Sequence, residues 1–162
     1  MATDEHSPSA APAPPANAQQ VARTEVAVGI LQRADNALLL TTRPAGKAYP
    51  GYWEFPGGKL ERGETVEQAL RRELDEELGI VIDSAQVLEV TEYDYPHALV
   101  RLHWCLVRAW QGQLLMREGQ THAWQQFPLT VQPILPGAWP LLRRIAAQRG
   151  VSELTAYPIN PS

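Results

Sequence analysis

Residues 58–80 of the chain read GKLERGETVEQALRRELDEELGI. Apolar side chains recur there at every fourth position: Val66, Leu70, Leu74 and Leu78. That spacing places them on one face of a helix, so we expect a helix from Glu64 to Leu78. Gly79 follows directly and is expected to end the helix, because glycine readily adopts the left-handed conformation found after helix C-termini.

Three acidic side chains lie at the border of that apolar face. Glu73, Glu76 and Glu77 fall within an arc of about 100°, because positions i, i+3 and i+4 of a helix share one side. Like charges at this spacing destabilise a helix, and a bound cation would reverse the effect. Carboxylates suit Mg²⁺ or Mn²⁺, which proteins often share with the phosphates of a substrate. The stretch therefore predicts a metal-assisted enzyme that acts on phosphates.

Length and composition limit the class of protein. The 162 residues are enough for one domain, and the 44% hydrophobic content is enough for its core. A net charge of −4 argues against a surface that coats a polyanion, so we expect no direct nucleic-acid binding. The single cysteine, Cys105, excludes an internal disulfide and fits a cytoplasmic protein. No apolar run is long enough for a membrane helix.

Composition divides the chain into three parts. Residues 1–20 are rich in Ala and Pro and are expected to form a disordered tail. Residues 21–150 are expected to form the folded domain, and residues 151–162 a C-terminal tail. These boundaries leave a single domain to carry any activity.

Within that domain the pattern predicts strands on both sides of the acidic helix. The expected strands are residues 24–32, 37–42, 85–95 and 99–110, with shorter ones at 114–115 and 124–127. The first two are expected to pair as a β-hairpin, because the intervening RADN is turn-forming. Residues 137–149 are expected to form a closing helix. This order predicts an α+β fold with a mixed β-sheet between helices.

The motif at residues 58–80 resembles the Nudix box, G-x5-E-x7-R-E-U-x-E-E-x-G-U with U an aliphatic residue, and matches it at every specified position. Four further segments resemble the MutT branch of that family: Val26–Ile30, Glu54–Gly58, Glu92–Tyr93 and Glu118–Gln120. The resemblance covers roughly residues 23–148. It implies an α/β/α sandwich and the Mg²⁺-dependent hydrolysis of a nucleoside triphosphate to a monophosphate and pyrophosphate, with Mn²⁺ as an alternative ion.

The resemblance also implies roles for single residues near the metal. The implied metal ligands are one glycine carbonyl and three glutamates: Gly57, Glu73, Glu76 and Glu77. Glu73 or Glu118 is the implied general base, and the choice stays open because coupled acids titrate together. Arg72 can pair with Glu76 or with Glu64, and either contact would orient a metal ligand.

Substrate contacts are implied on both sides of the loop over residues 43–53. Arg43 is implied to contact a phosphate, which its planar guanidinium suits. The implied substrate-binding segment after the loop comprises Glu54, Phe55, Pro56 and Gly57. Adjacent glycines at its end let a ligand approach the backbone closely.

Two positions depart from the MutT pattern, and both concern the base of the substrate. Relatives that prefer 8-oxo-dGTP carry an asparagine before the last helix, where this chain has Ala138, and an acidic residue where it has His97. An alanine side chain forms no hydrogen bond, so it cannot read the base as an asparagine does. Tyr95 or Trp139 could stack on a base or pack in the core.

Three hypotheses follow, each with a small-molecule nucleotide as partner. The first is hydrolysis of an oxidised purine triphosphate such as 8-oxo-dGTP. The second keeps the chemistry and takes a pyrimidine triphosphate or a nucleoside diphosphate sugar. The third is a non-catalytic nucleotide-binding domain, against which the complete set of glutamates argues. His97, His103 and His122 lack the spacing of a shared metal site and are expected to be structural or solvated.

Overall fold

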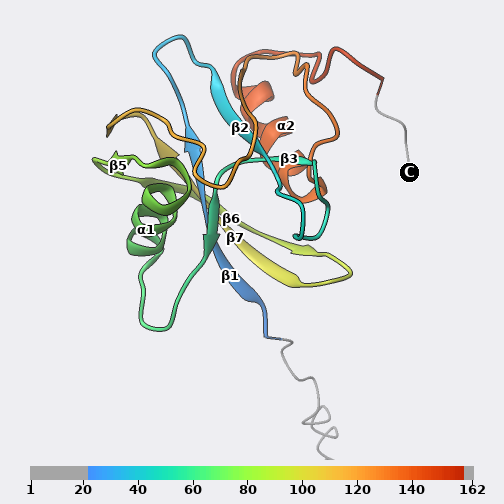
Figure 1. Ribbon diagram of the computed structural model, residues 1–162. Helices are drawn as coiled ribbons and strands as arrows, with labels where there is room; N and C mark the ends of the chain where they lie inside the picture. The colour runs from blue at the N-terminus through green and yellow to red at the C-terminus, as the bar shows by residue number, and fades with distance from the viewer. Residues whose placement is uncertain (1–21, 159–162) are drawn as a thin grey trace, which may run out of the picture.

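The computed structural model describes residues 22–158, so the tail expected over residues 1–20 lies outside the described residues. The described chain forms, in order, β1 (Thr24–Leu31), β2 (Leu38–Thr42), β3 (Trp53–Glu54), β4 (Gly57–Lys59), α1 (Val66–Leu78), β5 (Val81–Ile82), β6 (Gln86–Asp94), β7 (Leu99–Val107), β8 (Trp110–Gln111), β9 (His122–Gln125), η1 (Pro136–Ala138) and α2 (Trp139–Gln148). Figure 1 shows α1 and α2 on opposite sides of the strands. No helix in residues 22–158 is both long and apolar enough to cross a membrane.

The main sheet is mixed, as the sequence predicts, with the strand order β4-β1-β7-β6. β1 runs parallel to β7, from Thr24 opposite Val100 to Leu31 opposite Val107. β4 and β6 pair antiparallel to the two outer edges of this pair. Because parallel strands cannot be joined by a tight turn, the chain between β1 and β7 crosses one face of the sheet and forms α1 there.

The turn predicted between the first two strands is confirmed, since Arg33 donates its N–H to the Ala37 carbonyl at 3.0 Å, but the strand pairing expected beyond it is wrong. In the described chain β1 and β2 meet at the bridge between Gln32 and Leu38 and then diverge. β7 pairs along all of β1 on one edge, and β4 pairs with Val26–Val28 on the other. β2 therefore joins a second, three-stranded sheet of order β3-β2-β9.

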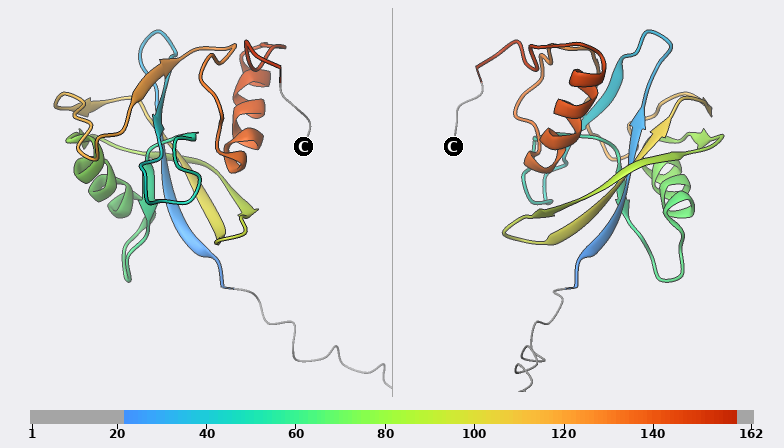
Figure 2. Two further views of the ribbon diagram at one scale, coloured as in Figure 1. Left: turned by 45° about the vertical axis from the view of Figure 1, so that its right-hand side comes forward. Right: turned by 180° about the vertical axis from the view of Figure 1, so that it is seen from behind.

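Side chains of the strands alternate between two cores, one under each helix. The core under α1 includes Ala27, Leu31, Leu39, Leu70, Leu74, Leu78 and Cys105, all fully buried. The core under α2 includes Val28, Ile30, Leu40, Trp104, Leu141 and Leu142. Figure 2 shows the main sheet between the two helices. The predicted α/β/α sandwich is thus confirmed.

The acidic helix is defined by caps at both ends. Thr65 precedes it, and its side chain accepts the N–H of Gln68 at 3.2 Å while the Gln68 side chain accepts the N–H of Thr65 at 3.0 Å. This reciprocal cap starts α1 at Val66, two residues after the predicted start. Gly79 ends the helix with φ of 67° and donates its N–H to the Asp75 carbonyl at 2.9 Å, as predicted.

The strand predicted at residues 114–115 is wrong, because this segment lies over the C-terminal end of α1. Leu115 donates its N–H to the Leu78 carbonyl at 2.9 Å, and Arg117 donates to the Glu77 carbonyl at 3.1 Å. The last carbonyls of a helix have no partner inside the helix, so a loop that supplies donors there is favoured. The short strand forms earlier instead, as β8 against β5.

The end of the described chain returns to the body of the domain. The closing helix is preceded by the single turn η1 and carries Pro140 in its first turn. After α2, in the segment predicted as a C-terminal tail, Leu154 accepts the N–H of Leu129 at 2.8 Å. Ala156 donates its N–H to the Leu129 carbonyl at 2.8 Å, and Thr155 between them is buried.

Candidate active site

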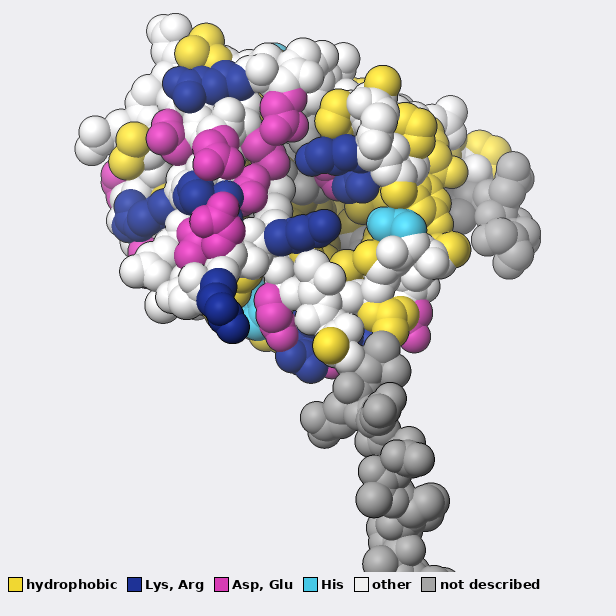
Figure 3. All heavy atoms as spheres, turned by 60° about the horizontal axis from the view of Figure 1, so that its bottom comes forward, with side chains coloured by type: hydrophobic (Ala, Val, Ile, Leu, Met, Phe, Trp, Pro, Cys, Tyr) yellow, Lys and Arg dark blue, Asp and Glu magenta, His cyan; other side chains and the backbone are white. Residues whose placement is uncertain are grey.

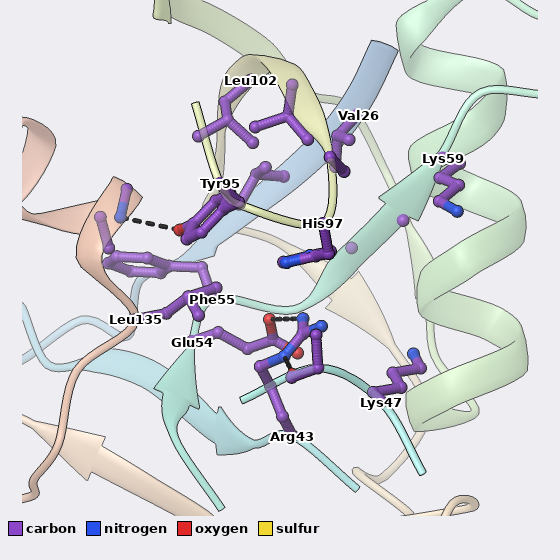
Figure 4. Close-up of a pocket in the computed structure, with 18 of the residues that line it drawn as sticks. Val26, Arg43, Lys47, Glu54, Phe55, Lys59, Tyr95, His97, Leu102 and Leu135 are labelled. Carbon is purple, nitrogen blue, oxygen red and sulfur yellow. Dashed lines mark hydrogen bonds and ion pairs between the residues drawn. The ribbon is translucent and has the colours of Figure 1, made fainter. Parts of the chain in front are cut away.

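A pocket with a volume of about 350 Å³ lies beside the loop that follows β2. Apolar and aromatic side chains form most of its lining: Val26, Val28, Phe55, Tyr95, Val100, Leu102, Trp104, Leu135 and Ala138. The polar and charged lining residues are Arg43, Lys47, Glu54, Lys59 and His97. Figure 4 shows Arg43, Glu54 and Lys47 on one side and Tyr95, Leu102 and Val26 on the other. Such a lining suits a molecule with an apolar part and an anionic part.

Tyr95 forms a fixed wall of the apolar side. Its hydroxyl accepts the N–H of Gly137 at 2.8 Å, which links β6 to the turn before α2. Burial raises the pKa of Tyr95 to about 12, so the phenol stays protonated. Its ring lies 4.4 Å from the ring of Tyr93 and 5.5 Å from that of Tyr49, centroid to centroid. Tyr95 therefore both lines the pocket and packs in the core, whereas Trp139 packs against the core beneath α2.

The two positions that depart from the MutT pattern both line this pocket. Ala138 is buried at its apolar side and offers no hydrogen-bonding side chain. His97 is exposed at the rim, with its ring 5.3 Å from the ring of Tyr95 and 5.7 Å from that of Tyr49. The sequence grouped His97 with the structural or solvated histidines because these residues lack the spacing of a shared metal site; the contact with Tyr49, 48 residues away, appears only in the fold.

Arg43 and Glu54 form an ion pair at the charged side of the pocket. The Arg43 Nη1 donates to the Glu54 carboxylate at 2.7 Å, and its Nε donates to the Ala48 carbonyl at 2.6 Å. Burial raises the pKa of Glu54, and the Arg43 guanidinium opposes that rise. Arg43 therefore holds both a partly buried acid and the loop that follows β2.

Gly57 and Gly58 bring β4 into close contact with its neighbours. Gly57 has φ of 152°, and a Cβ there would lie 2.1 Å from the Ala27 carbonyl oxygen. A Cβ on Gly58 would lie 2.3 Å from the carboxyl carbon of Glu73. The Glu73 carboxylate thus lies directly against the β4 backbone. Pro56, directly before β4, is buried, and its carbonyl accepts the N–H of Gly29 at 2.8 Å.

Glu77 is the buried acid of α1, with 8% of its surface exposed. Burial raises the pKa of its carboxyl to about 9, and the charges of Glu73 and Glu118 add to the rise. Glu54 acts in the same direction. Four carboxyl groups from β3, α1 and the loop before β9 therefore share one electrostatic environment. Figure 3 shows acidic side chains grouped on one side of the hollow in this face of the molecule.

These acids fit a divalent cation by their chemistry and burial. A buried carboxyl with like charges around it is costly to ionise, and a cation beside it removes that cost. Glu76 is more exposed than Glu73, with 59% of its side chain accessible against 16%, although both carboxylates contact Arg72. In residues 22–158 no three metal-ligating side chains form a ready-made metal cluster. The donor set therefore fits a cation without a preformed coordination shell.

Arg72 joins α1 to the loop before it. Its guanidinium donates to both carboxylate oxygens of Glu64, at 2.8 and 2.9 Å, and to the Lys59 carbonyl at 3.0 Å. It also donates to Glu73 at 2.9 Å and lies 3.5 Å from Glu76. The Arg72 hydrogen bonds lower the pKa of Glu64 to about 2. Both partners predicted for Arg72 are thus found, and Glu73 is a third.

The position of Glu118 is set by hydrogen bonds of its own backbone and of the two residues Gln120 and Thr121. Its backbone N–H donates to the Gln120 side-chain oxygen at 3.0 Å. The side-chain nitrogen of the buried Gln120 donates to the Glu77 carbonyl at 3.3 Å. Thr121 then donates its N–H to the Thr42 hydroxyl at 2.9 Å, next to Arg43. The exposed Glu118 side chain is therefore carried by a loop tied to both α1 and β2.

Lys47 and Lys59 line the pocket although no site role was inferred for them from the sequence. One signal could have found them. They are the only lysines among the 14 basic residues of the chain, and both lie within a few residues of the predicted substrate-binding segment. Arginine carries the positive charge everywhere else in the sequence.

Comparison with known proteins agrees with this architecture. The family model for the NUDIX domain matches residues 23–147. The chain is 38% identical over 122 residues to the 8-oxo-dGTP diphosphatase of Haemophilus influenzae, covering 75% of this chain and 90% of that protein. It is 36% identical over 126 residues to the CTP pyrophosphohydrolase of Escherichia coli, covering 77% and 93%.

A solved structure gives the same result in three dimensions. The MutT structure from a study of Aliivibrio salmonicida and Vibrio cholerae aligns with a TM-score of 0.63 at 33% identity, over 78% of this chain and 99% of that chain. Family, relatives and fold therefore coincide over the described body of the protein. The chain belongs to the Nudix hydrolases, enzymes that act on phosphoric anhydrides, and has MutT-type relatives.

Proposed function

We propose that this chain hydrolyses a nucleoside triphosphate to the monophosphate and pyrophosphate with Mg²⁺ or Mn²⁺, and that 8-oxo-dGTP or a related oxidised nucleotide is its substrate. The observation that carries the proposal is the buried Glu77, which shares its environment with Glu73 and Glu118 beside a pocket of about 350 Å³. That volume lies in the range of pockets for small ligands and cofactors. The 38% identity to the 8-oxo-dGTP diphosphatase of Haemophilus influenzae supports the choice of substrate.

The residues that would hold the cation are Glu73, Glu76 and Glu77, together with the Gly57 carbonyl. Glu77 gives the most direct support, because burial raises its pKa and an adjacent cation would favour the ionised form. Glu76 would leave Arg72 to join the group. A bound ion would supply charge neutralisation at the phosphoryl group and a more acidic water.

Either Glu73 or Glu118 would accept the proton of the attacking water. Glu73 is held by Arg72 on one side and by the Gly58 backbone on the other, so its carboxylate has a fixed direction. Glu118 is exposed on a loop and keeps more freedom. Arg72 would thus act by orienting Glu73, while Arg43, Glu54 and Phe55 would contact the nucleotide from the pocket lining.

A pyrimidine triphosphate is a second candidate substrate, favoured by Ala138. The pocket offers no side chain at this position to read the edge of an oxidised purine. Apolar contact alone discriminates weakly between bases. The CTP pyrophosphohydrolase of Escherichia coli is a relative of similar identity.

Steady-state hydrolysis separates these candidates. We would compare 8-oxo-dGTP, dGTP, CTP, the other nucleoside triphosphates and nucleoside diphosphate sugars with Mg²⁺, resolve the products, and use Glu77→Gln as the inactive control. A preference for 8-oxo-dGTP of about 100-fold or more in kcat/KM would support the first proposal. A preference for CTP would support the second. Turnover of diphosphate sugars alone, or of nothing in the panel, would contradict both.

A further inference from the structure

We propose that Lys47 contacts the phosphate chain of the substrate, bridging the apolar pocket and the carboxylates of α1. The inference rests on the proposed function, since it names the residue that guides a nucleotide's phosphates towards the hydrolytic acids. Its basis is the position of Lys47 in the pocket lining, the fixed backbone that carries it and the freedom of its ammonium group.

The backbone at Lys47 is set by a closed loop after β2. Arg43 accepts the N–H of Gly51 at 2.9 Å and donates its own N–H to the Tyr52 carbonyl at 2.8 Å, which closes the loop at its base. Within the loop Lys47 donates its N–H to the Pro44 carbonyl at 3.3 Å. The residue after it, Ala48, is held through its carbonyl by the Arg43 guanidinium at 2.6 Å. Lys47 therefore projects from a defined point at the pocket.

The Arg43 guanidinium is bound by protein groups, whereas the Lys47 ammonium group has no ion-pair partner in residues 22–158. The Arg43 guanidinium is shared between Glu54 and the Ala48 carbonyl, with only 17% of its side chain exposed. Lys47 takes part in none of the ion pairs among residues 22–158, and its side chain is exposed. A flexible ammonium group that is already hydrated can meet an incoming phosphate without breaking a protein contact. Arg43 thus holds the loop as well as lining the pocket, and Lys47 adds a second cation there that has no protein partner to give up.

The ammonium group lies between the two parts of the site. Burial raises the pKa of Glu77, and the Lys47 charge opposes that rise, so the ammonium group is close enough to act on this acid of α1. It also opposes the rise at Glu54, after the larger effect of Arg43. Figure 4 shows the Lys47 side chain extending away from the Arg43–Glu54 pair, in the direction of α1. A phosphate chain that runs from the pocket to Glu73 and Glu77 would pass this group.

The test uses the fact that the chain has two lysines, Lys47 and Lys59. Reductive ¹³C-methylation labels these and the N-terminal amine while keeping their charge, so the carbon–proton NMR spectrum reports each group separately. Lys47→Arg identifies the Lys47 signal by removing it. Titration with magnesium pyrophosphate, the product the proposed reaction releases, is expected to shift the Lys47 signal to saturation and leave the N-terminal signal in place. This arm does not depend on which base the enzyme prefers.

Kinetics supply the second arm. Lys47→Ala is expected to lower kcat/KM for the best triphosphate about 10-fold or more, chiefly through KM, because one charge-assisted contact is lost. Lys47→Arg should restore most of it, and Arg143→Ala should match the wild type, since Arg143 is an exposed cation on α2. Three results would each overturn the inference. In the first, the Lys47 signal stays fixed while the phosphorus signal shows that pyrophosphate is bound. In the second, pyrophosphate does not bind at millimolar concentration, and in the third, kcat/KM of Lys47→Ala lies within about twofold of the wild type. If the wild type hydrolyses no triphosphate, the proposed function fails, and the NMR arm alone decides on Lys47.

Discussion

Gly57 and Gly58 are adjacent, but each allows a different close contact. Substituting each glycine in turn should therefore separate an effect on stability from an effect on activity. Gly57→Ala places a Cβ 2.1 Å from the Ala27 backbone oxygen at φ of 152°, and neither atom can move away cheaply. We expect a loss of about 3 kcal/mol or more in the free energy of unfolding. For a chain of this length that corresponds to a fall of about 6–12 °C in melting temperature. Calorimetry of the purified variant measures it.

Gly58→Ala meets the end of a flexible side chain instead, the Glu73 carboxyl group at 2.3 Å. Glu73 can rotate away, so we expect the fold to be kept and the melting temperature to change by less than about 4 °C. The displaced carboxylate should lower kcat by about 100-fold, because an acid moved by an ångström no longer meets its metal or water. Equal loss of stability in both glycine variants, or full activity of Gly58→Ala, would contradict this division.

At this scale the sequence predicts the acids well and their surroundings poorly. Helix periodicity fixes Glu73 and Glu77 relative to each other, and the fold brings the charge of Glu118 to bear on Glu77, while the roles of all three acids stay predictions. The sequence could not choose among the partners of Arg72, which reaches Glu64, Glu73 and Glu76 at once. It also gave no sign that the charge of Lys47 acts on Glu77, because the two residues are 30 positions apart in the chain.

Among the elements, the loop before β9 depends on Gln120 for its attachment to α1. Gln120→Ala removes the bond to the Glu118 N–H at 3.0 Å and the bond to the Glu77 carbonyl at 3.3 Å. Each is a modest contact, so we expect a loss of about 1–2 kcal/mol in stability, measured by urea unfolding. We expect kcat to fall by about 10-fold if the loop presents Glu118 to the site.

A double variant shows whether Gln120 acts through Glu118. If it does, adding Gln120→Ala to Glu118→Gln should change kcat by less than about twofold, since residues that act as a unit are not additive. Independent, multiplying effects would mean that the loop contributes to activity by another route. Thr130→Ala serves as a control, because its hydroxyl contacts a buried glutamine, Gln125, away from the pocket.

Arg72 connects two elements, the loop over residues 59–64 and α1. Arg72→Lys keeps a positive charge but loses the paired bonds to the Glu64 carboxylate at 2.8 and 2.9 Å. We expect Mg²⁺ affinity to fall by about 10-fold or more, because Glu73 loses the group that orients it. The Mg²⁺ concentration for half-maximal activity measures the change. A Glu64→Gln variant with the same defect would place the origin in the loop, and unaltered Mg²⁺ dependence in both would exclude an orienting role.

The sequence predicted elements correctly where residues close in the chain determine them. It failed where distant strands pair with the same strand. Thr65 and Gly79 mark the ends of α1 through their own hydrogen bonds, so the helix is predicted to within two residues. The turn between β1 and β2 forms as predicted, but the two strands do not pair beyond it, because β1 pairs with β7 and β4 while β2 pairs with β3 and β9. Leu114 and Leu115 resemble a strand in composition, but the segment lies over the end of α1, where the Leu115 N–H donates to the last carbonyl of the helix.

Across the whole molecule, the residues of the candidate site come from the four-stranded sheet, the three-stranded sheet and α1. Arg43 follows β2, Glu54 ends β3, the two glycines form β4, and the acids of α1 lie across from them. Figure 3 shows the result as a hollow with acidic side chains on one side and apolar side chains on the other. The sequence predicts the layers of this arrangement, while the distances across the pocket arise only when both cores are packed.

Glu77 links the stability of the whole molecule to pH. Burial raises its pKa from 4.5 to about 9 in the metal-free fold, so between these values the folded state binds more protons than the unfolded state. The stability contributed by the protonated carboxyl is therefore complete below about pH 4.5 and lost as the pH rises through about 9. In a chelator, we expect the melting temperature of the wild type to fall from about pH 6 to about pH 8.5, and that of Glu77→Gln to fall much less.

Mg²⁺ should reverse this dependence, because an ion beside Glu77 favours the ionised carboxylate and its binding then releases a proton. We expect Mg²⁺ to raise the melting temperature of the wild type most at about pH 8.5 and that of Glu77→Gln little at any pH. Glu76→Gln is the matched control in the chelator, since Glu76 is 59% exposed and should leave the slope unchanged. Parallel slopes for the wild type and Glu77→Gln without metal would show that Glu77 is not the group that couples folding to pH. Proton release on mixing with Mg²⁺ at about pH 7, measured in weak buffer, provides an independent measure of the same linkage.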